Sequence, residues 1–374
     1  MKKKMVYVLL AAILFMAPFW GGCSRPESNA TKDLTPEEGY IIVTDYLGKK
    51  VKVKQNPDYI GSVFAVSSHV LAMFGDVEKI VAISEGNRRD FLFCEIYPQI
   101  LEARVVKGNN MLNIEEIAKH PRPEVLIFNP EVTLDDKMMT QLEKLGIPIV
   151  TIAYDSMEQQ QQTIELLGKI VGREEEAAEY KEYYRQVIEL VTSRTKDIPQ
   201  EERKTVYHAI NELLRTDRPN SLSEDWLNAV GVNNVALQEG KKEVFGIEKN
   251  YVSLEELLQW DPEYIIINGG DVLDYINANK QLHNLRAYRE GKIYLLPLGV
   301  SRWGHPYSIE TPLAILWTAK TIYPELFPDI DIEKETRDFY LKFFDYQLSD
   351  EQVAKILSGR EYKQIKGWGE PSVN

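Results

Sequence analysis

The residues best suited to binding chemistry lie in one short stretch, residues 298–308, which reads LGVSRWGHPYS. It places Arg302, Trp303, His305 and Tyr307 within six residues. An arginine can hold a carboxylate or phosphate through two parallel hydrogen bonds, and a tryptophan supplies flat apolar area. Histidine and tyrosine can coordinate a metal or hydrogen-bond to a chelate. The stretch therefore predicts a ligand-binding loop with these four side chains as its candidates.

Three further candidates belong to apolar segments that read as strands. Arg88 and Arg89 follow the expected strand 80–84, and His208 lies within the expected strand 205–210. In open α/β sheets, ligands collect outside the carboxyl ends of the strands. Arginines at such ends, in a chain whose net charge is −13, indicate that the ligand is an anion.

Each candidate also has a purely structural interpretation. Trp303 would fit a hydrophobic core equally well, and His208 would fit a hydrogen-bonded core histidine because its strand is apolar. Only one of Arg88 and Arg89 is expected to face a ligand, with the other pairing with a surface acid. No direct metal ligand is assigned, and His305 and His208 are the residues that could serve as one.

Short apolar strands alternate with helices along the chain, which indicates an α/β fold with parallel sheets covered by helices on both faces. A hairpin is expected first, at 40–54. The expected strands are 59–66, 80–84, 125–128, 149–153, 205–210, 264–267 and 293–296. The expected helices include one capped by Ser67 or Ser68, and others at 134–145, 223–230, 311–323, 332–344 and 349–357.

A long amphipathic helix is expected from about Arg173 to Thr195, because apolar residues recur along it at steps of three and four. The stretches 113–129 and 253–268, on either side of it, resemble each other. Each reads as a short capped helix, a proline-containing turn and an apolar strand ending in Asn. The predicted fold class is therefore α/β, with two Rossmann-like lobes bridged by a single long α-helix and a ligand cleft between the lobes.

The N-terminus has the pattern of a secretory signal, with three lysines, an apolar run shorter than the ~20 residues of a membrane span, and a small-residue end. Its Gly-Gly-Cys ending resembles a bacterial lipoprotein signal, which implies that Cys23 is lipidated, although Trp20 departs from the usual aliphatic residue. The expected boundaries are a lipoprotein signal peptide at 1–22, a flexible tether at 23–38, an N-terminal lobe at 39–155, a linker with the bridging helix at 156–198, a C-terminal lobe at 199–359 and a loose tail at 360–374.

Four segments, in this order, resemble the iron–siderophore and cobalamin type of substrate-binding protein, the class III or helical-backbone group that serves ABC importers. They read TDYLGKKVKV at 44–53, LGKIVGREEEAAEY at 167–180, VSLEELLQWDPEYIII at 252–267 and GKIYLLP at 291–297. The resemblance implies two lobes bridged by one helix and a ligand held between them. It also implies that one exposed glutamate per lobe meets the permease, and the matching residues are Glu115 and Glu255.

The resemblance implies an extracytoplasmic binding protein, lipid-anchored to the cell membrane or periplasmic, that delivers its ligand to a permease dimer. A metal chelate, above all a ferric siderophore, is the expected ligand; haem, cobalamin or another corrinoid, and an oxyanion such as molybdate, are the alternatives. No cofactor is expected, although the ligand can carry iron or another metal. The protein is expected to be a monomer.

An exported enzyme and a structural lipoprotein are the competing classes. Gly299, Ser301 and Gly304 resemble a nucleophile elbow, but the second glycine stands one place too late for Gly-x-Ser-x-Gly. A zinc-protease motif, a phosphate-binding loop and a dinucleotide fingerprint are all missing from the sequence. The net negative charge argues against a nucleic-acid partner. We therefore expect a binding protein and no enzymatic activity.

Overall fold

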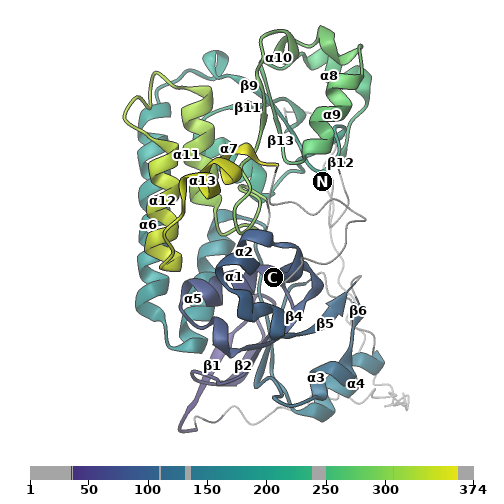
Figure 1. Ribbon diagram of the computed structural model, residues 1–374, viewed down its shortest axis with the longest axis vertical. Helices are drawn as coiled ribbons and strands as arrows, with labels where there is room; N and C mark the ends of the chain where they lie inside the picture. The colour runs from purple at the N-terminus through teal and green to yellow at the C-terminus, as the bar shows by residue number, and fades with distance from the viewer. Residues whose placement is uncertain are drawn as a thin grey trace, which may run out of the picture. The chain divides into compact units, whose positions relative to one another are not determined.

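The computed structural model describes residue 35 and residues 37–108, 111–130, 136–237, 250–305 and 307–360. The candidate signal peptide, Cys23 and the tail from residue 361 lie outside these ranges. Figure 1 shows two α/β halves, the N-terminal one in purple and blue and the C-terminal one in green, with a long helix running past both.

The N-terminal half begins with the expected hairpin, made of antiparallel strands β1 (Tyr40–Thr44) and β2 (Lys50–Lys54). Asp45 shapes its turn by accepting hydrogen bonds from the backbone nitrogens of Leu47 and Lys49. A six-stranded sheet follows in the order β6-β5-β4-β3-β7-β8, parallel except for β6. Its strands are β3 (Ile60–Ser62), β4 (Ile80–Ser84), β5 (Arg104–Gly108), β6 (Met111–Leu112), β7 (Val125–Phe128) and β8 (Ile149–Thr151).

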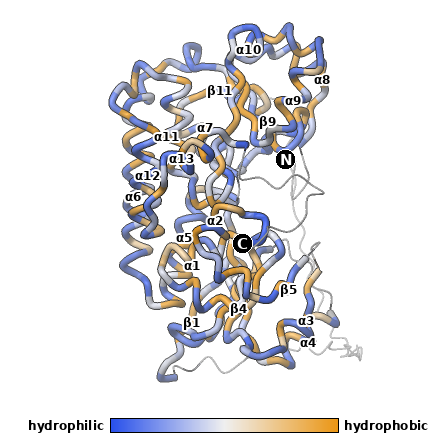
Figure 2. Tube along the Cα trace, in the orientation of Figure 1, coloured by the Kyte–Doolittle hydropathy of each residue, from blue (hydrophilic) through white to orange (hydrophobic). Residues whose placement is uncertain are grey.

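The C-terminal half holds a second sheet in the order β12-β10-β9-β13-β14, with β11 also paired to β9. Its central strands β9, β13 and β14 are parallel, whereas β10 runs antiparallel to both of its neighbours, β9 and β12. The strands are β9 (Thr205–Ala209), β10 (Arg215–Thr216), β11 (Asn233–Asn234), β12 (Asn250–Tyr251), β13 (Tyr264–Ile267) and β14 (Ile293–Leu295). In Figure 2 the strands carry most of the hydrophobic colour, because they are buried between the helices.

The helices cover the two sheets and connect the halves. Those of the N-terminal half are α1 (Ala65–Met73), α2 (Phe91–Ile96), α3 (Ile114–Ala118), α4 (Asp136–Leu145) and α5 (Met157–Val171). Those of the C-terminal half are α7 (Leu222–Val230), α8 (Leu254–Trp260), α9 (Gly270–Ala278), α10 (Arg286–Arg289), α11 (Thr311–Ile322), α12 (Ile332–Phe344) and α13 (Asp350–Ser358).

The expected cap of α1 is wrong. The helix begins at Ala65, with Phe64 as the N-cap residue, so Ser67 and Ser68 lie inside it. Both serines are buried; the Ser67 hydroxyl donates to the Phe64 carbonyl, and the Ser68 hydroxyl donates to Ser62. The two serines marked the region correctly, but the expected cap lies three to four residues after the observed one.

The predicted bridging helix is confirmed as α6 (Glu174–Thr195), and its apolar stripe is buried. One continuous hydrophobic core includes this stripe together with residues of both halves, such as Leu71 of α1 and Leu313 of α11. α6 packs against α5 on one side and against α11 and α7 on the other. α6 therefore packs against both halves and contributes to the hydrophobic core that they share.

The repeated segments occupy equivalent places in the two halves. α3 leads into β7, which pairs with β3, and α8 leads into β13, which pairs with β9. Asn113 caps α3 and Ser253 caps α8, each by accepting from a backbone nitrogen three residues on. Both strands are fully buried. The topology thus agrees with the sequence repeat.

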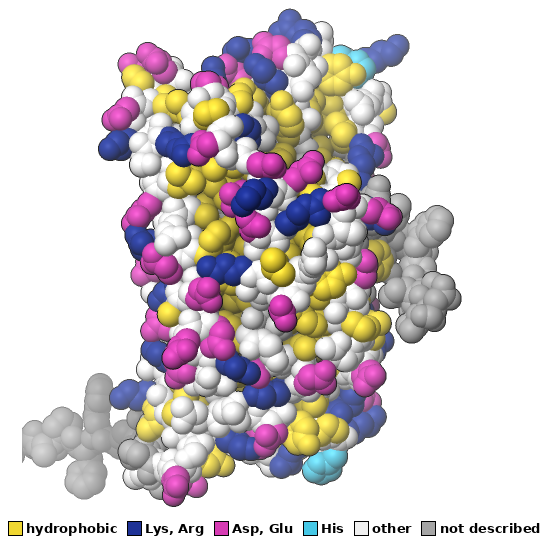
Figure 3. All heavy atoms as spheres, turned by 60° about the vertical axis from the view of Figure 1, so that its left-hand side comes forward, with side chains coloured by type: hydrophobic (Ala, Val, Ile, Leu, Met, Phe, Trp, Pro, Cys, Tyr) yellow, Lys and Arg dark blue, Asp and Glu magenta, His cyan; other side chains and the backbone are white. Residues whose placement is uncertain are grey.

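Among the described residues, no helix is long and apolar enough to cross a membrane. Figure 3 shows acidic and basic side chains interspersed over the face that carries α6 and α12. This face offers no extended patch of a single sign.

Candidate ligand-binding site

The loop between β14 and α11 reaches the carboxyl ends of β9 and β13, and it is held there by several buried groups. Gly304 has a φ of +68°, in the left-handed region, and a Cβ at this position would lie 2.8 Å from the Trp226 ring. The Trp226 indole nitrogen donates to the Gly304 carbonyl at 2.9 Å. Only glycine fits this turn, and its contact with Trp226 fixes the backbone conformation of the loop here.

Arg302 projects from this loop onto the end of the C-terminal sheet. Its Nη1 donates to Asn211 Oδ1 at 2.5 Å, and the Asn211 backbone nitrogen donates to Asn268 Oδ1 at 2.6 Å. These contacts join the loop to the ends of β9 and β13, as the sequence predicted for strand-end residues. Burial lowers the pKa of Arg302, and the negative charges of Asp271 and Asp90 oppose that change.

His305 is a neutral side chain at this site. Burial, with the positive charges of Arg302 and Arg215 and the nearby His208, lowers its pKa to about 3. Its Nδ1 faces the backbone N–H of Tyr307 at 3.4 Å, as an acceptor. The ring proton of the neutral form therefore belongs on Nε2, where it can be donated to a ligand.

His208 is buried and forms a pair with a buried carboxylate. Its Nδ1 lies 2.9 Å from Asp217 Oδ1, and Asn234 donates to Asp217 Oδ2 at 2.8 Å. The His208 Nε2 is buried, and no described residue hydrogen-bonds to it. A carboxylate on one ring nitrogen fixes the ring and leaves the other nitrogen for a ligand. His208 therefore fits both the core interpretation and the site interpretation.

Residues of both halves meet beside these groups. The Phe64 ring of the N-terminal half lies edge-on to Tyr307, with ring centroids 4.7 Å apart, and Tyr154 packs against Phe64 at 6.3 Å. The Tyr154 hydroxyl is buried and has no hydrogen-bond partner among the residues described. The junction is thus lined by aromatic rings as well as by cations.

Trp303 does not supply the stacking surface that the sequence suggested. It is fully buried in the core, and its indole nitrogen donates to Glu310 Oε1 at 3.0 Å. Arg302 contacts Asn211 at the end of β9, whereas the neighbouring Trp303 contacts Glu310 in the core. The core interpretation of Trp303 is the correct one.

Arg88 and Arg89 have different surroundings. Arg88 is half-buried, and its Nη2 donates to the Leu101 carbonyl at 3.3 Å within the N-terminal half. Arg89 is exposed and makes no ion pair with any residue in the described ranges. The buried Arg88 Nε has no hydrogen-bond partner among the described residues, so both arginines keep donors that these contacts do not use.

Sequence reasoning missed Arg215 and Tyr154. Arg215 lies in the two-residue strand β10, which pairs with β9, and its charge acts on His305. A strand this short leaves no periodic pattern, so nothing in the sequence marked it. Tyr154 lies one residue beyond the expected strand 149–153, and nothing in the sequence singled it out.

Two other features are set apart from this junction. No group of three or more His, Cys, Asp or Glu side chains suited to a metal occurs within the described ranges. A groove of about 500 Å³ lies between α5 and α6, but its charged side chains pair with one another, as Glu165 does with Lys169 and Lys181. These paired charges are therefore not left unpaired for a ligand, and the groove is not a candidate site.

The chain belongs to the periplasmic binding protein family, whose model matches residues 57–298. It is 24% identical over 341 residues to the molybdate-binding protein MolA of Haemophilus influenzae, covering 84% of this chain and 93% of that protein. Members of this family are solute-binding proteins of transporters and not enzymes. The protein is accordingly a substrate-binding protein of an ABC importer.

Solved structures share the fold. A periplasmic solute-binding protein from Veillonella parvula is 28% identical, with a TM-score of 0.73, and the match covers 85% of this chain and 97% of that one. MolA bound to molybdate is 22% identical, with a TM-score of 0.72 and coverage of 83% and 99%. Helicobacter pylori CeuE with Ni(II) bound is 21% identical, with a TM-score of 0.66 and coverage of 85% and 99%. Two lobes bridged by α6 are thus confirmed as the fold class.

Proposed function

We propose that the protein captures an oxyanion between its lobes, at the carboxyl end of the C-terminal sheet, and delivers it to the importer. Arg302 and Arg215 would bind the anion, with the Nε2 proton of His305 and the Tyr307 hydroxyl as further donors. Arg89 would approach from the N-terminal lobe. The proposal draws on side chains of the described chain and needs no resident metal or cofactor.

The observation that carries this proposal is a pair of arginines without carboxylate partners. Arg215 and Arg302 both act electrostatically on His305, yet neither forms an ion pair with a described residue. Burial still lowers the pKa of Arg302 despite the negative charges of Asp271 and Asp90, so these two carboxylates do not fully offset the cost of burying its guanidinium group. An anionic ligand would supply the missing charge, because charge-assisted hydrogen bonds are strong in partly buried sites.

A small oxyanion suits the junction better than a large chelate. Phe64 and Tyr307 touch across the two lobes, which limits the space near Arg302. Trp303, which would have widened the stacking surface, belongs to the core. The likeness to MolA supports the same ligand class, with molybdate as the first oxyanion to test.

A ferric siderophore is the second candidate. The aromatic rings of Phe64 and Tyr307 next to Arg302 favour an anionic aromatic chelate, since arginine and aromatic side chains bind both its charge and its rings. Such a chelate would carry its own iron, consistent with a site that offers no protein metal cluster in its described part.

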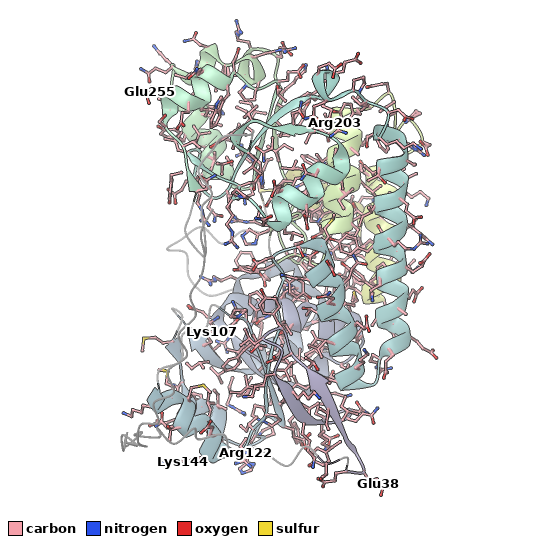
Figure 4. The ribbon with its side chains drawn as sticks, turned by 180° about the vertical axis from the view of Figure 1, so that it is seen from behind. Glu38, Lys107, Arg122, Lys144, Arg203 and Glu255 are labelled. Carbon is pink, nitrogen blue, oxygen red and sulfur yellow. The ribbon has the colours of Figure 1, made fainter. Side chains whose placement is uncertain are left out.

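Equilibrium titration of the full-length mature protein with molybdate, tungstate, sulfate and a ferric catecholate would decide between these ligands. Replacing Arg302 or Arg215 by Gln should weaken oxyanion binding by about 1.5–3 kcal/mol, tenfold or more in Kd, because each removes a charge-assisted hydrogen bond. Arg203, which is labelled in Figure 4, precedes β9, whereas Arg302 contacts Asn211 after the other end of this strand; Arg203→Gln makes the same charge change and should bind normally. If only the ferric chelate bound, the second candidate would be the ligand and the oxyanion proposal would be wrong. If all three variants lost the same affinity, the proposed site would be wrong.

We also propose that Cys23 carries a lipid that anchors the protein, and that Glu115 and Glu255 dock on the permease. Glu115 and Glu255 are exposed on α3 and α8, and neither has an ion-pair partner within the described ranges. Glu255 projects outward from its lobe (Figure 4), and α3 and α8 lie at opposite ends of the view on the side away from α6 (Figure 1). This placement would let two acids reach two permease subunits.

A further inference from the structure

A buried carboxylate lies behind the ligand loop. Glu310, just before α11, is fully buried and accepts four hydrogen bonds. Its Oε2 accepts from the Ser301 backbone nitrogen at 2.7 Å and the Ser301 hydroxyl at 2.8 Å. Its Oε1 accepts from the Trp303 indole nitrogen at 3.0 Å and the Tyr340 hydroxyl at 2.5 Å. Three of these four donors belong to Ser301 and Trp303, the residues on either side of Arg302.

We propose that Glu310 is a positioning residue, which fixes the backbone on both sides of Arg302 and so aims its guanidinium group at the ligand. The inference rests on the proposed role of Arg302 in anion binding. Glu310 does not itself contact the ligand, because it is fully buried and both of its oxygens accept from the protein groups named above.

The surrounding residues are shaped around this carboxylate. A Cβ at Gly299 would overlap sterically with Glu310 Oε1 and the Tyr340 hydroxyl, so only glycine leaves room for them. The Tyr340 hydroxyl also accepts from the Val300 backbone nitrogen at 2.8 Å. Glu310 and Tyr340 together therefore hold two consecutive backbone nitrogens, those of Val300 and Ser301.

The loop is secured at its other end as well. The Ser308 hydroxyl accepts from the Glu310 backbone nitrogen at 3.0 Å and lies 2.9 Å from the Ser301 hydroxyl. Gln160 of α5 donates to the Ser308 carbonyl at 2.9 Å, and Tyr180 of α6 donates to the Ile309 carbonyl at 2.5 Å. Glu310 thus joins the segment that carries Arg302 to residues 308–310, and these residues are held by hydrogen bonds from α5 and the bridging helix α6.

An ionised carboxylate satisfies these donors, whereas an amide of the same shape cannot. In Glu310→Gln, the NH₂ group would face the Ser301 backbone N–H in one orientation and the Trp303 indole N–H in the other. One buried donor would be left unpaired either way. Amide hydrogen exchange of residues 299–303 should therefore be faster in the ligand-free variant, and oxyanion binding should be about tenfold weaker or more.

Two further variants separate positioning from a general loss of stability. Tyr340→Phe keeps the ring, removes one donor to Glu310 and frees the Val300 backbone nitrogen, so a smaller change in the same two readouts is expected. Leu257→Ala empties core space around α8, in a hydrophobic cluster that excludes the ligand loop. It should lower the melting temperature while leaving loop exchange and oxyanion affinity at wild-type values.

Wild-type loop exchange in Glu310→Gln, or wild-type affinity despite faster exchange, would overturn the proposal. The proposal would also be overturned if Glu310→Gln lost no more oxyanion affinity than a Leu257→Ala variant of equal melting temperature. Should Glu310→Gln fail to fold, Tyr340→Phe decides the question on the same criteria. If the wild-type protein bound no oxyanion, the proposed function would fail, and the exchange comparison would still decide whether Glu310 fixes the loop.

Discussion

At the residue scale, the candidate site combines charged arginines with a neutral histidine that can donate a hydrogen bond. Arg302 and Arg215 carry the positive charge, whereas His305 is kept neutral by burial beside them. Arg302, His305 and Tyr307 could be selected from the sequence because they crowd one loop after a strand. The inward direction of Trp303 could not, since its partner Glu310 is defined only once the loop has folded back.

The lowered pKa of His305 predicts how the protein responds to acid. Below about pH 6.5 the unfolded chain takes up a proton on this histidine, while the folded protein does so only near pH 3. Stability should therefore fall as the pH drops through this range, and His305→Gln should remove that share of the loss. Urea unfolding of both proteins at pH 7.5, 5.5 and 4.5 measures it; the same pH dependence in the variant would show that His305 titrates normally.

At the element scale, α6 was predictable, and the contact of the C-terminal helices with the N-terminal half was not. The buried stripe of α6 follows from its local periodicity. By contrast, Tyr97 after α2 donates to the Phe344 carbonyl at 2.9 Å, although the two are 247 residues apart in the chain. Gln352 of α13 likewise donates to Glu95 of α2 at 2.8 Å. Such pairings depend on the assembled fold, and no spacing in the sequence encodes them.

These contacts act as a second connection between the lobes, beside α6. We therefore expect that ligand binding changes the lobe angle by only a few degrees. Tyr97→Phe combined with Glu95→Ala should lower the free energy of unfolding by about 1–3 kcal/mol, because it removes two inter-lobe hydrogen bonds and each contributes about 0.5–1.5 kcal/mol. Solution scattering with and without ligand tests the rigidity. A large ligand-driven compaction of the wild-type protein would contradict it, and unchanged stability of the double variant would show that the contacts contribute nothing.

At the scale of the whole molecule, the proposed docking role assigns the matching helices α3 and α8 of the two lobes to contacts with the importer. Glu115→Ala combined with Glu255→Ala should abolish transport in vesicles that contain the cognate permease, while ligand affinity stays unchanged. Reversal to Arg at either position should be worse than Ala, because like charges would then meet. Gln259, an exposed residue on α8, provides a matched control as Gln259→Ala. Normal uptake by the double variant would exclude the docking role, and weakened ligand binding would place these residues in the fold or the site instead.

The central claim is that an oxyanion binds beside Arg302 and Arg215, and anomalous diffraction tests it most directly. Crystals of the protein grown with molybdate would be measured on both sides of the molybdenum absorption edge. We predict one strong anomalous peak between the lobes, within hydrogen-bond reach of the Arg302 and Arg215 guanidinium groups and of His305 Nε2. A peak elsewhere in the molecule, or its absence at saturating molybdate, would contradict the proposed site.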